Sequence, residues 1–298
     1  MDFSTGTPTR YALVTGATSG IGYELTQLLA KDGYNLIIVA RNENRLYTLA
    51  DDIKLAYGVE VTPLVFDLFS PAAPQAIYDA VQAMAVPIDI LVNDAGQGEW
   101  GPFSESPLQR DLDIIQLNIT SMIALTKLFL RNMIGQKKGK ILLLGSEAAS
   151  GPMPLLAVYA ATKAFVVSFG MALANELKDT ELSVTVLLPG ATDTDFFHKA
   201  HQENTVTYRE TALADPVQVA KDGYDALMKG ESKVVSGMKT KWHVFMNNIM
   251  SDEMSADAMR KQNEPSTKDE GRASATHPAS REERREIDAL KGGFDGDL

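Results

Sequence analysis

The stretch YALVTGATSGIG, residues 11–22, decides the fold of this chain of 298 residues. Five residues typical of a strand run into a turn with three glycines, and a helical pattern begins directly after it. Gly16, Gly20 and Gly22 allow a tight turn and a close approach of the backbone to a ligand, and the following helix offers free N–H groups at its start. This order predicts a site for nucleotide phosphates. The alternative is that the glycines only close a β–α turn.

Strand and helix alternate along the sequence up to about residue 240. We interpret short apolar runs rich in β-branched residues as buried strands at 11–15, 34–40, 59–68, 88–93, 139–146, 182–190 and 232–237. Continuous apolar strands suit a sheet that is covered on both faces. The alternation therefore predicts an α/β fold: a doubly wound parallel sheet of about seven strands, a Rossmann fold, in a single domain.

The two ends of the chain lack this pattern. From Gln262 onward the only large apolar residues are Ile287, Leu290, Phe294 and Leu298. Such a segment buries too little apolar surface to offset the entropy of ordering. We therefore expect a flexible N-terminus at 1–9, the folded domain at 10–250, and a polar, disordered C-terminal tail at 251–298.

Composition excludes several classes of function. A net charge of −11 argues against nucleic acid or an anionic membrane as the main partner. The chain has no cysteine, which removes disulfides, thiolate nucleophiles and cysteine metal sites. The N-terminus shows no signal-peptide pattern, and no apolar run approaches the ~20 residues of a membrane helix. We expect a cytoplasmic protein that acts on a small molecule.

The segment VYAATKAFVVSFG, residues 158–170, places Tyr159 and Lys163 four residues apart. On a helix these positions share one face, one turn apart. A cation held beside a phenol stabilises the phenolate and lowers the pKa of the phenol, so the pair suits a tuned proton donor. By itself the pair is equally typical of an ordinary amphipathic helix, with the tyrosine half buried and the lysine solvated.

The end of the second expected strand bears on the choice of nucleotide. About 20 residues after the glycines, an acid would bind a free ribose 2′-hydroxyl. Here the strand ends in Ala40 and Arg41, and a guanidinium can hold a 2′-phosphate through two hydrogen bonds. This favours NADP(H) over NAD(H). The alternative is that Arg41 is an ordinary surface arginine.

Seven motifs together give the sequence a family resemblance. They are TGATSGIG (15–22), DL (67–68), NDAG (93–96), Asn118, Ser146, YAATK (159–163) and PGATDT (189–194). In this order and at roughly this spacing they resemble the short-chain dehydrogenase/reductase family, in particular its NADP-preferring, carbonyl-reductase-like members. The resemblance covers about residues 10–240.

The resemblance implies roles for these residues. Tyr159 would exchange a proton with the substrate oxygen, Lys163 would lower the pKa of Tyr159, and Ser146 would bind the substrate oxygen. Asn118 would hold a relay water between the lysine and solvent. The implied cofactor-binding residues are Gly16, Thr18, Ser19, Gly20, Ile21, Gly22, Arg41, Asp67, Leu68, Asn93, Ala95, Gly96, Tyr159, Lys163, Pro189, Gly190, Thr192 and Thr194.

The implied activity is hydride transfer between NADP(H) and a secondary alcohol, ketone or aldehyde. The family resemblance also implies a homodimer or homotetramer through helices near 107–134 and 155–178. One alternative is a catalytically silent Rossmann protein that senses a nucleotide, against which Ser146, Tyr159 and Lys163 argue. Another is a methyltransferase or an epimerase, but the G-x-x-G-x-x-G spacing of extended epimerases is absent.

Two departures from the family pattern stand out. Asp94 replaces the usual asparagine, and we expect its carboxylate to accept backbone N–H groups as the amide would, without loss of activity. Ser19 stands where many NADP-preferring members have a basic residue, which weakens the preference for NADP(H).

Aromatic and histidine residues suggest the nature of the substrate site. Trp100, Phe103, Met153, Leu155, Phe196 and Phe197 predict a pocket that is at least partly apolar, although the two phenylalanines fit a core equally well. His198 and His201 are spaced for a metal on a helix, but no third ligand is evident, so no metal site is expected.

Overall fold

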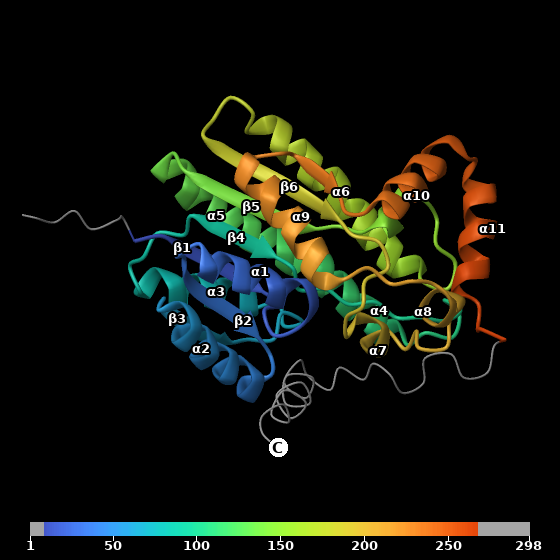
Figure 1. Ribbon diagram of the computed structural model, residues 1–298, viewed down its shortest axis with the longest axis horizontal. Helices are drawn as coiled ribbons and strands as arrows, with labels where there is room; N and C mark the ends of the chain where they lie inside the picture. The colour runs from blue at the N-terminus through green and yellow to red at the C-terminus, as the bar shows by residue number, and fades with distance from the viewer. Residues whose placement is uncertain (1–8, 268–298) are drawn as a thin grey trace, which may run out of the picture.

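The computed structural model describes residues 9–267 and contains one seven-stranded sheet (Figure 1). The strands are β1 (Tyr11–Thr15), β2 (Asn35–Ala40), β3 (Val61–Val65), β4 (Ile90–Asn93), β5 (Gly139–Leu144), β6 (Leu182–Leu188) and β7 (Lys233–Val235). Their order is β3-β2-β1-β4-β5-β6-β7, and every neighbouring pair is parallel. The order reverses between β1 and β4, which is where such sheets bind ligands. The predicted Rossmann fold is confirmed.

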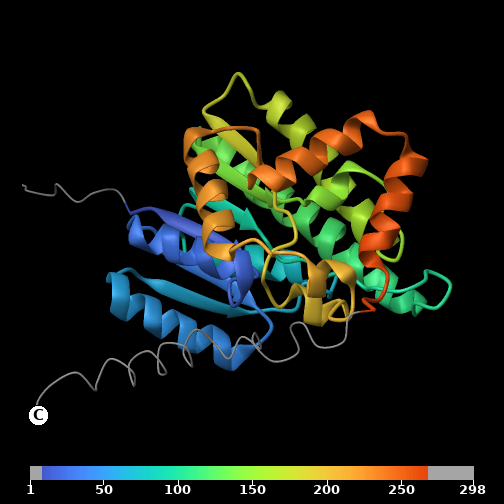
Figure 2. The ribbon, with the colours of Figure 1, turned by 45° about the vertical axis from the view of Figure 1, so that its right-hand side comes forward.

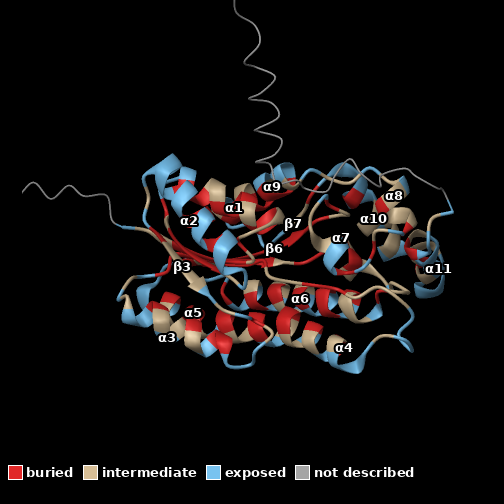
Figure 3. Cartoon of the chain, turned by 90° about the horizontal axis from the view of Figure 1, so that it is seen from below, coloured by how far each residue is buried: buried red, intermediate tan, exposed pale blue. Residues whose placement is uncertain are grey.

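Helices cover both faces of the sheet (Figure 3). One layer contains α1 (Gly20–Lys31), α2 (Glu43–Tyr57) and α9 (Pro216–Lys229), and the other contains α3 (Ala73–Ala83), α4 (Leu108–Ile115), α5 (Met122–Gln136) and α6 (Ala157–Glu176). Successive strand residues alternate between two cores: Val14 belongs to one and Leu13 to the other. The inner strands β1, β2, β4, β5 and β6 form continuous apolar runs because both of their faces are buried, whereas the edge strands β3 and β7 are partly exposed.

Two helices are long and apolar enough to span a membrane by length and composition alone. They are the continuous helix Leu108–Gln136 and α6. Both lie in the same layer of Figure 3, and each directs part of its surface toward the sheet. Phe129 and Val166, for example, are almost fully buried in the core on this side of the sheet.

The C-terminal part of the described chain corrects one expectation. Helices α10 (Met238–Ile249) and α11 (Asp252–Asn263) lie beyond the carboxyl edge of the sheet (Figures 1 and 2), so the predicted disorder from residue 251 is wrong for α11. Ser251 caps α11 by accepting a hydrogen bond from the Met254 N–H. The helix carries acids in its first turn and bases in its last, which complements its dipole. The expectations for residues 1–8 and 268–298 concern parts of the chain outside the described residues.

Candidate active site

The glycine turn leads directly into the N-terminus of α1. Gly16 and Gly20 have φ angles of +72° and +59°, which favour glycine. A methyl group on Gly22 would lie 2.5 Å from the Gly16 carbonyl oxygen, so the turn and the helix touch there. Ser19 makes no side-chain cap on α1, and Gly20 and Ile21 line a cleft. The first N–H groups of α1 therefore lie beside this cleft, in an arrangement that suits a phosphate.

Asp94 packs against the glycine turn. Its carboxylate accepts a hydrogen bond from the Gly22 backbone, as expected for the residue that replaces asparagine. The side chain is buried, and its Oδ1 has no hydrogen-bond partner within residues 9–267. Burial raises the pKa of Asp94 to about 7, and the positive charge of Lys163 opposes this rise. Keeping Asp94 ionised in this buried position therefore costs free energy.

Ser146 and Tyr159 meet in the wall of the cleft. Ser146 follows β5 and accepts a hydrogen bond from the Ala148 N–H at 3.1 Å, at the start of the 3₁₀ turn Glu147–Ser150. Tyr159 lies in the first turn of α6, and its side chain shares a hydrogen bond with that of Ser146. The strand end and the helix start therefore bring the two hydroxyl groups together.

The pKa of Tyr159 differs from the expectation. Burial raises it to about 12, the hydrogen bond from Ser146 opposes this, and the charge of Glu147 raises it further. Lys163 does not produce the expected lowering. Its Nζ donates to the Leu144 carbonyl at 2.8 Å and lies 5.7 Å from the centre of the Tyr159 ring. Burial lowers the pKa of Lys163 itself to about 8.

Asn118 lies in a π-helical turn, Gln116–Ser121, between α4 and α5. Its Oδ1 accepts from the Gln97 N–H at 3.0 Å, and its Nδ2 donates to the Gln97 carbonyl and to Thr162 Oγ1, both at 2.9 Å. Thr162 in turn donates to the Tyr159 carbonyl at 2.7 Å. Asn118 therefore fixes α6 against the loop after β4. The oxygen and the nitrogen of its side-chain amide are both engaged within the protein, and the relay water remains a prediction.

The structure divides the predicted cofactor residues into two groups. Those in the wall of the cleft are Ser19, Gly20, Ile21, Gly96, Tyr159, Pro189, Gly190, Thr192 and Thr194. The others lie behind it or along the same edge of the sheet: Gly16, Thr18, Gly22, Arg41, Asp67, Leu68, Asn93, Ala95 and Lys163.

Contacts of the second group show what holds it in place. The Arg41 guanidinium lies over the Phe69 ring at 4.9 Å, and its Nε is 3.9 Å from Asp67 Oδ1. Half of the Arg41 side chain is exposed, so it is accessible to a ligand. Asn93 turns away from the cleft and donates to Thr126 Oγ1 at 3.0 Å, which ties β4 to α5.

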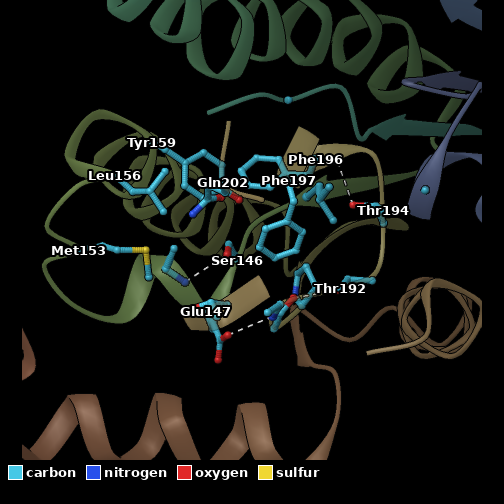
Figure 4. A pocket seen from close by; sticks show the side chains of 18 of the residues that line it. Ser146, Glu147, Met153, Leu156, Tyr159, Thr192, Thr194, Phe196, Phe197 and Gln202 are labelled. Atoms are coloured by element: carbon cyan, nitrogen blue, oxygen red, sulfur yellow. Dashed lines mark hydrogen bonds between the residues drawn. The ribbon is translucent and has the colours of Figure 1, made fainter. Parts of the chain in front are cut away.

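The wall of the cleft around Tyr159 contains both apolar and polar side chains (Figure 4). Met153, Leu156, Phe196, Phe197 and Met259 form its apolar part. The Phe196 ring centre is 4.8 Å from that of Tyr159, while Phe197 is buried and its ring centre lies 5.1 Å from that of Tyr208. Phe196 thus fits the expected role beside the substrate, whereas Phe197 both lines the cleft and packs in the interior.

Three residues of the expected pocket do not line the cleft. Phe103 is exposed, and Leu156 takes the place expected for Leu155. The Trp100 indole N–H donates to the Asn263 carbonyl at 2.8 Å, which holds α11 in place.

Sequence reasoning missed a set of polar residues around the cleft. Glu147 accepts from the Ala191 N–H and faces His243 Nδ1, both at 3.1 Å. Lys199 donates to Ser19 Oγ at 3.3 Å, which brings a cation to the position where this chain lacks the basic residue of many NADP-preferring members. The remaining members are Gln202, Thr207, Asn247, Gln262 and Asn263. Only Glu147, next to Ser146, has a sequence signal, because the others come from distant segments.

The two histidines considered for a metal face different carboxylates. His198 Nδ1 lies 3.2 Å from Glu203 Oε1, and His201 Nδ1 lies 3.0 Å from Glu99 Oε1. The described part of the chain contains no cluster of three histidine or acidic residues placed to hold a metal ion.

The glycine turn, the Ser146–Tyr159 pair and Lys163 meet at the switch point of a doubly wound sheet, which defines a dinucleotide-binding protein of the oxidoreductase type. Residues 10–205 match the family model of the short chain dehydrogenases. The chain belongs to this family.

Known relatives agree with this assignment. The very-long-chain 3-oxoacyl-CoA reductase of Laccaria bicolor is 37% identical over 177 residues, which are 58% of this chain and 52% of the relative. The chain spans 50–60% of the length of the first curated relatives it matches.

Solved structures also match. The short-chain dehydrogenase from Sphingobium yanoikuyae in complex with NADPH is 26% identical, with a TM-score of 0.71 over 81% of this chain and 97% of that chain. A Burkholderia phymatum short chain dehydrogenase/reductase in complex with NAD is 21% identical, with a TM-score of 0.73 over 87% of this chain and 98% of that chain, and supports the fold alone.

Proposed function

We propose that this protein transfers a hydride between NADP(H) and a secondary alcohol, ketone or aldehyde. The observation that carries the proposal is the hydrogen bond between Ser146 and Tyr159 in the wall of the cleft that also contains the glycine turn. A hydrogen-bond donor pair beside a nucleotide site is what carbonyl reduction requires of a protein.

The residues present fit a dinucleotide. A side chain at Gly20 would touch Thr194 at 3.0 Å, so this glycine leaves the backbone free for close approach. Gly16 and Gly22 let the turn close under it, and the uncapped start of α1 lies beside the cleft. When bound, the nicotinamide supplies the hydride.

The protein's own residues supply the proton and the stabilisation of charge. In carbonyl reduction, Ser146 and Tyr159 would donate hydrogen bonds to the substrate oxygen while negative charge develops on it. With a pKa of about 12, Tyr159 is protonated at neutral pH and can donate its proton to an alkoxide, which is a stronger base than a phenolate. Lys163 would hold a positive charge on the same side of α6, 5.7 Å from the centre of the Tyr159 ring, too far to offset the rise of the Tyr159 pKa by burial.

A preference for NADP(H) is supported by two cations. Arg41 follows β2 with its guanidinium half exposed, and Lys199 reaches Ser19 beside the glycine turn. Either can pair with phosphate. The similar enzyme from Sphingobium yanoikuyae is described in complex with NADPH. Asp67, 3.9 Å from Arg41, is the carboxylate that competes for the guanidinium.

We also propose a homo-oligomer formed through α4, α5 and α6. Apolar side chains remain exposed on these helices, among them Leu112, Ile115 and Phe165. Phe165 stacks on Phe169 with ring centres 6.0 Å apart, which places two parallel aromatic rings side by side on α6. A strictly monomeric species in light scattering would contradict this assembly.

The replacement Tyr159→Phe tests the function. Loss of the phenolic proton donor is expected to lower kcat for carbonyl reduction by a factor on the order of 10²–10⁴ and to leave NADPH binding intact. The measurements are NADPH consumption with a panel of ketones and calorimetric titration with NADPH. Full turnover by the variant would refute the role of Tyr159, and a wild-type protein that binds no nicotinamide cofactor would refute the function.

A further inference from the structure

Gln202 is a buried residue in the segment between α7 (Phe196–Lys199) and α8 (Val206–Glu210). Its backbone is fixed at both ends: its N–H donates to the Phe197 carbonyl at 2.8 Å, and its carbonyl accepts from the Thr205 N–H at 3.1 Å. The residue is 2% exposed, yet it lines the cleft. Figure 4 draws it together with Tyr159, Phe196 and Phe197 around the cleft.

The side-chain oxygen of Gln202 lacks a hydrogen bond. Its Oε1 is fully buried and finds no partner in the part of the chain that the structure describes. A buried polar atom without a hydrogen bond is costly, and a ligand that supplies the missing bond recovers this cost. Two other amides of the cleft are already used: Asn247 donates to Ser150 Oγ at 2.9 Å, and Asn263 donates to the Pro154 carbonyl at 3.0 Å.

The elements around Gln202 are tied to one another by hydrogen bonds. Thr207 Oγ1 donates to the Gln262 carbonyl at 2.9 Å, and the Val206 N–H donates to the Glu264 carbonyl at 3.0 Å. These bonds join α8 to the C-terminal end of α11. Asn263 is tied to Trp100 and Pro154 on other loops of the cleft. The free amide is therefore held in place before any substrate binds.

Two pairs of opposite charges near the cleft are engaged with each other. Glu147 faces His243 at 3.1 Å, and Lys199 lies 3.7 Å from Asp195. An uncharged partner therefore suits Gln202 best. A hydroxyl group can donate to the amide oxygen or accept from the amide nitrogen, so it satisfies the carboxamide in either orientation.

We propose that Gln202 binds a hydroxyl group of the substrate, and that the substrates are ketones or aldehydes with a hydroxyl on a neighbouring part of the molecule. This inference rests on the proposed function and names its substrate class. The apolar part of the cleft, with Met153, Leu156 and Phe196, accommodates the carbon skeleton of the substrate. Gln202 forms a hydrogen bond with the hydroxyl group of the substrate.

Matched substrates test the proposal. Each ketone of a small panel, cyclic and open-chain, is paired with derivatives that carry a hydroxyl one, two or three carbons from the carbonyl. For the wild type, the best hydroxylated derivative is expected to exceed its plain parent in kcat/KM by about tenfold or more. Gln202→Met should lose this preference by slowing the hydroxylated substrate and sparing the plain one.

Two controls separate this role from a structural one. Glu203→Gln changes the neighbouring residue, which faces His198 rather than the cleft, and should keep the preference. In thermal unfolding, Gln202→Met should be at least as stable as the wild type, because it removes an unsatisfied buried atom. A marked loss of stability would show that the amide has a partner inside the protein and would overturn the proposal.

The outcomes separate the role of Gln202 from the proposed function. Turnover of plain and hydroxylated ketones at equal rates, or a preference that survives in Gln202→Met, would overturn the role of Gln202 and leave the proposed function standing. Turnover of no ketone in the panel by a protein that binds NADPH would refute the proposed function, and the substrate class would fall with it.

Discussion

Gly22→Ala tests how tightly the glycine turn is packed against α1. A methyl group at this position would lie 2.5 Å from the Gly16 carbonyl oxygen and would also overlap the Asp94 carboxylate. Real Cβ atoms essentially never come closer than 3.0 Å to such atoms, so the turn or Asp94 must move. Overpacking of this kind costs typically ~1–3 kcal/mol, whereas alanine in a helix gains about 0.5–1 kcal/mol over glycine. The clash exceeds the gain because both neighbours are held in place.

Urea unfolding measures the net effect of the clash and of the gain in helix propensity on the free energy of unfolding. Gly22→Ala should lower the free energy of unfolding by roughly 1–2 kcal/mol, and it should weaken NADPH binding because the turn shifts. The matched control is Gly135→Ala in α5, where an added methyl meets no atom of the described chain within 4 Å. This control should be stabilised by about 0.5–1 kcal/mol. A Gly22→Ala protein as stable as Gly135→Ala would refute the reasoning.

Three further predictions concern charges of the site. Arg41→Ala should weaken NADPH binding by about tenfold or more, as expected for a lost charged hydrogen bond, and leave NADH binding unchanged; equal effects in calorimetric titration would contradict a phosphate contact. Because the pKa of Lys163 is about 8, carbonyl reduction should slow as pH rises through that value, and a rate that stays level to pH ~10 would show that its charge is not needed. The pKa of Asp94 is raised from 3.8 to about 7, so the folded state binds more protons than the unfolded chain between these values, and stability falls as pH rises through this window. Asp94→Asn should remove this fall, and urea unfolding of both proteins at the two ends of the window checks it.

The sheet and the core of the site could be predicted from the sequence for a simple physical reason. The inner strands β1, β2, β4, β5 and β6 are buried on both faces and appear as continuous apolar runs, and the edge strands β3 and β7 were recognisable from their β-branched residues. Parallel strands end at one edge, and residues that follow them, such as Ser146 and Pro189, must gather there. The i, i+4 spacing placed Tyr159 and Lys163 on one face of α6.

The remaining features depend on contacts between distant segments. Lys199 reaches Ser19 across 180 positions, and Asn263 meets Trp100 across 163, and neither contact leaves a periodic signal. Helix α11 looked like a polar tail because it is held by polar contacts rather than by an apolar stripe. The pKa of Tyr159 rises because burial outweighs the hydrogen bond with Ser146, and burial depends on the packing of the whole cleft.

The fate of the transferred hydride tests the central claim most directly. A ketone that the protein reduces is incubated with NADPH deuterated at the transferable position of the nicotinamide ring, and the alcohol is analysed by mass spectrometry. Direct hydride transfer predicts one deuterium on the carbinol carbon, formed by the wild type and lost almost completely with Tyr159→Phe. An alcohol without deuterium, or NADPH that binds but is never consumed with any ketone or aldehyde, would contradict the assignment as an oxidoreductase.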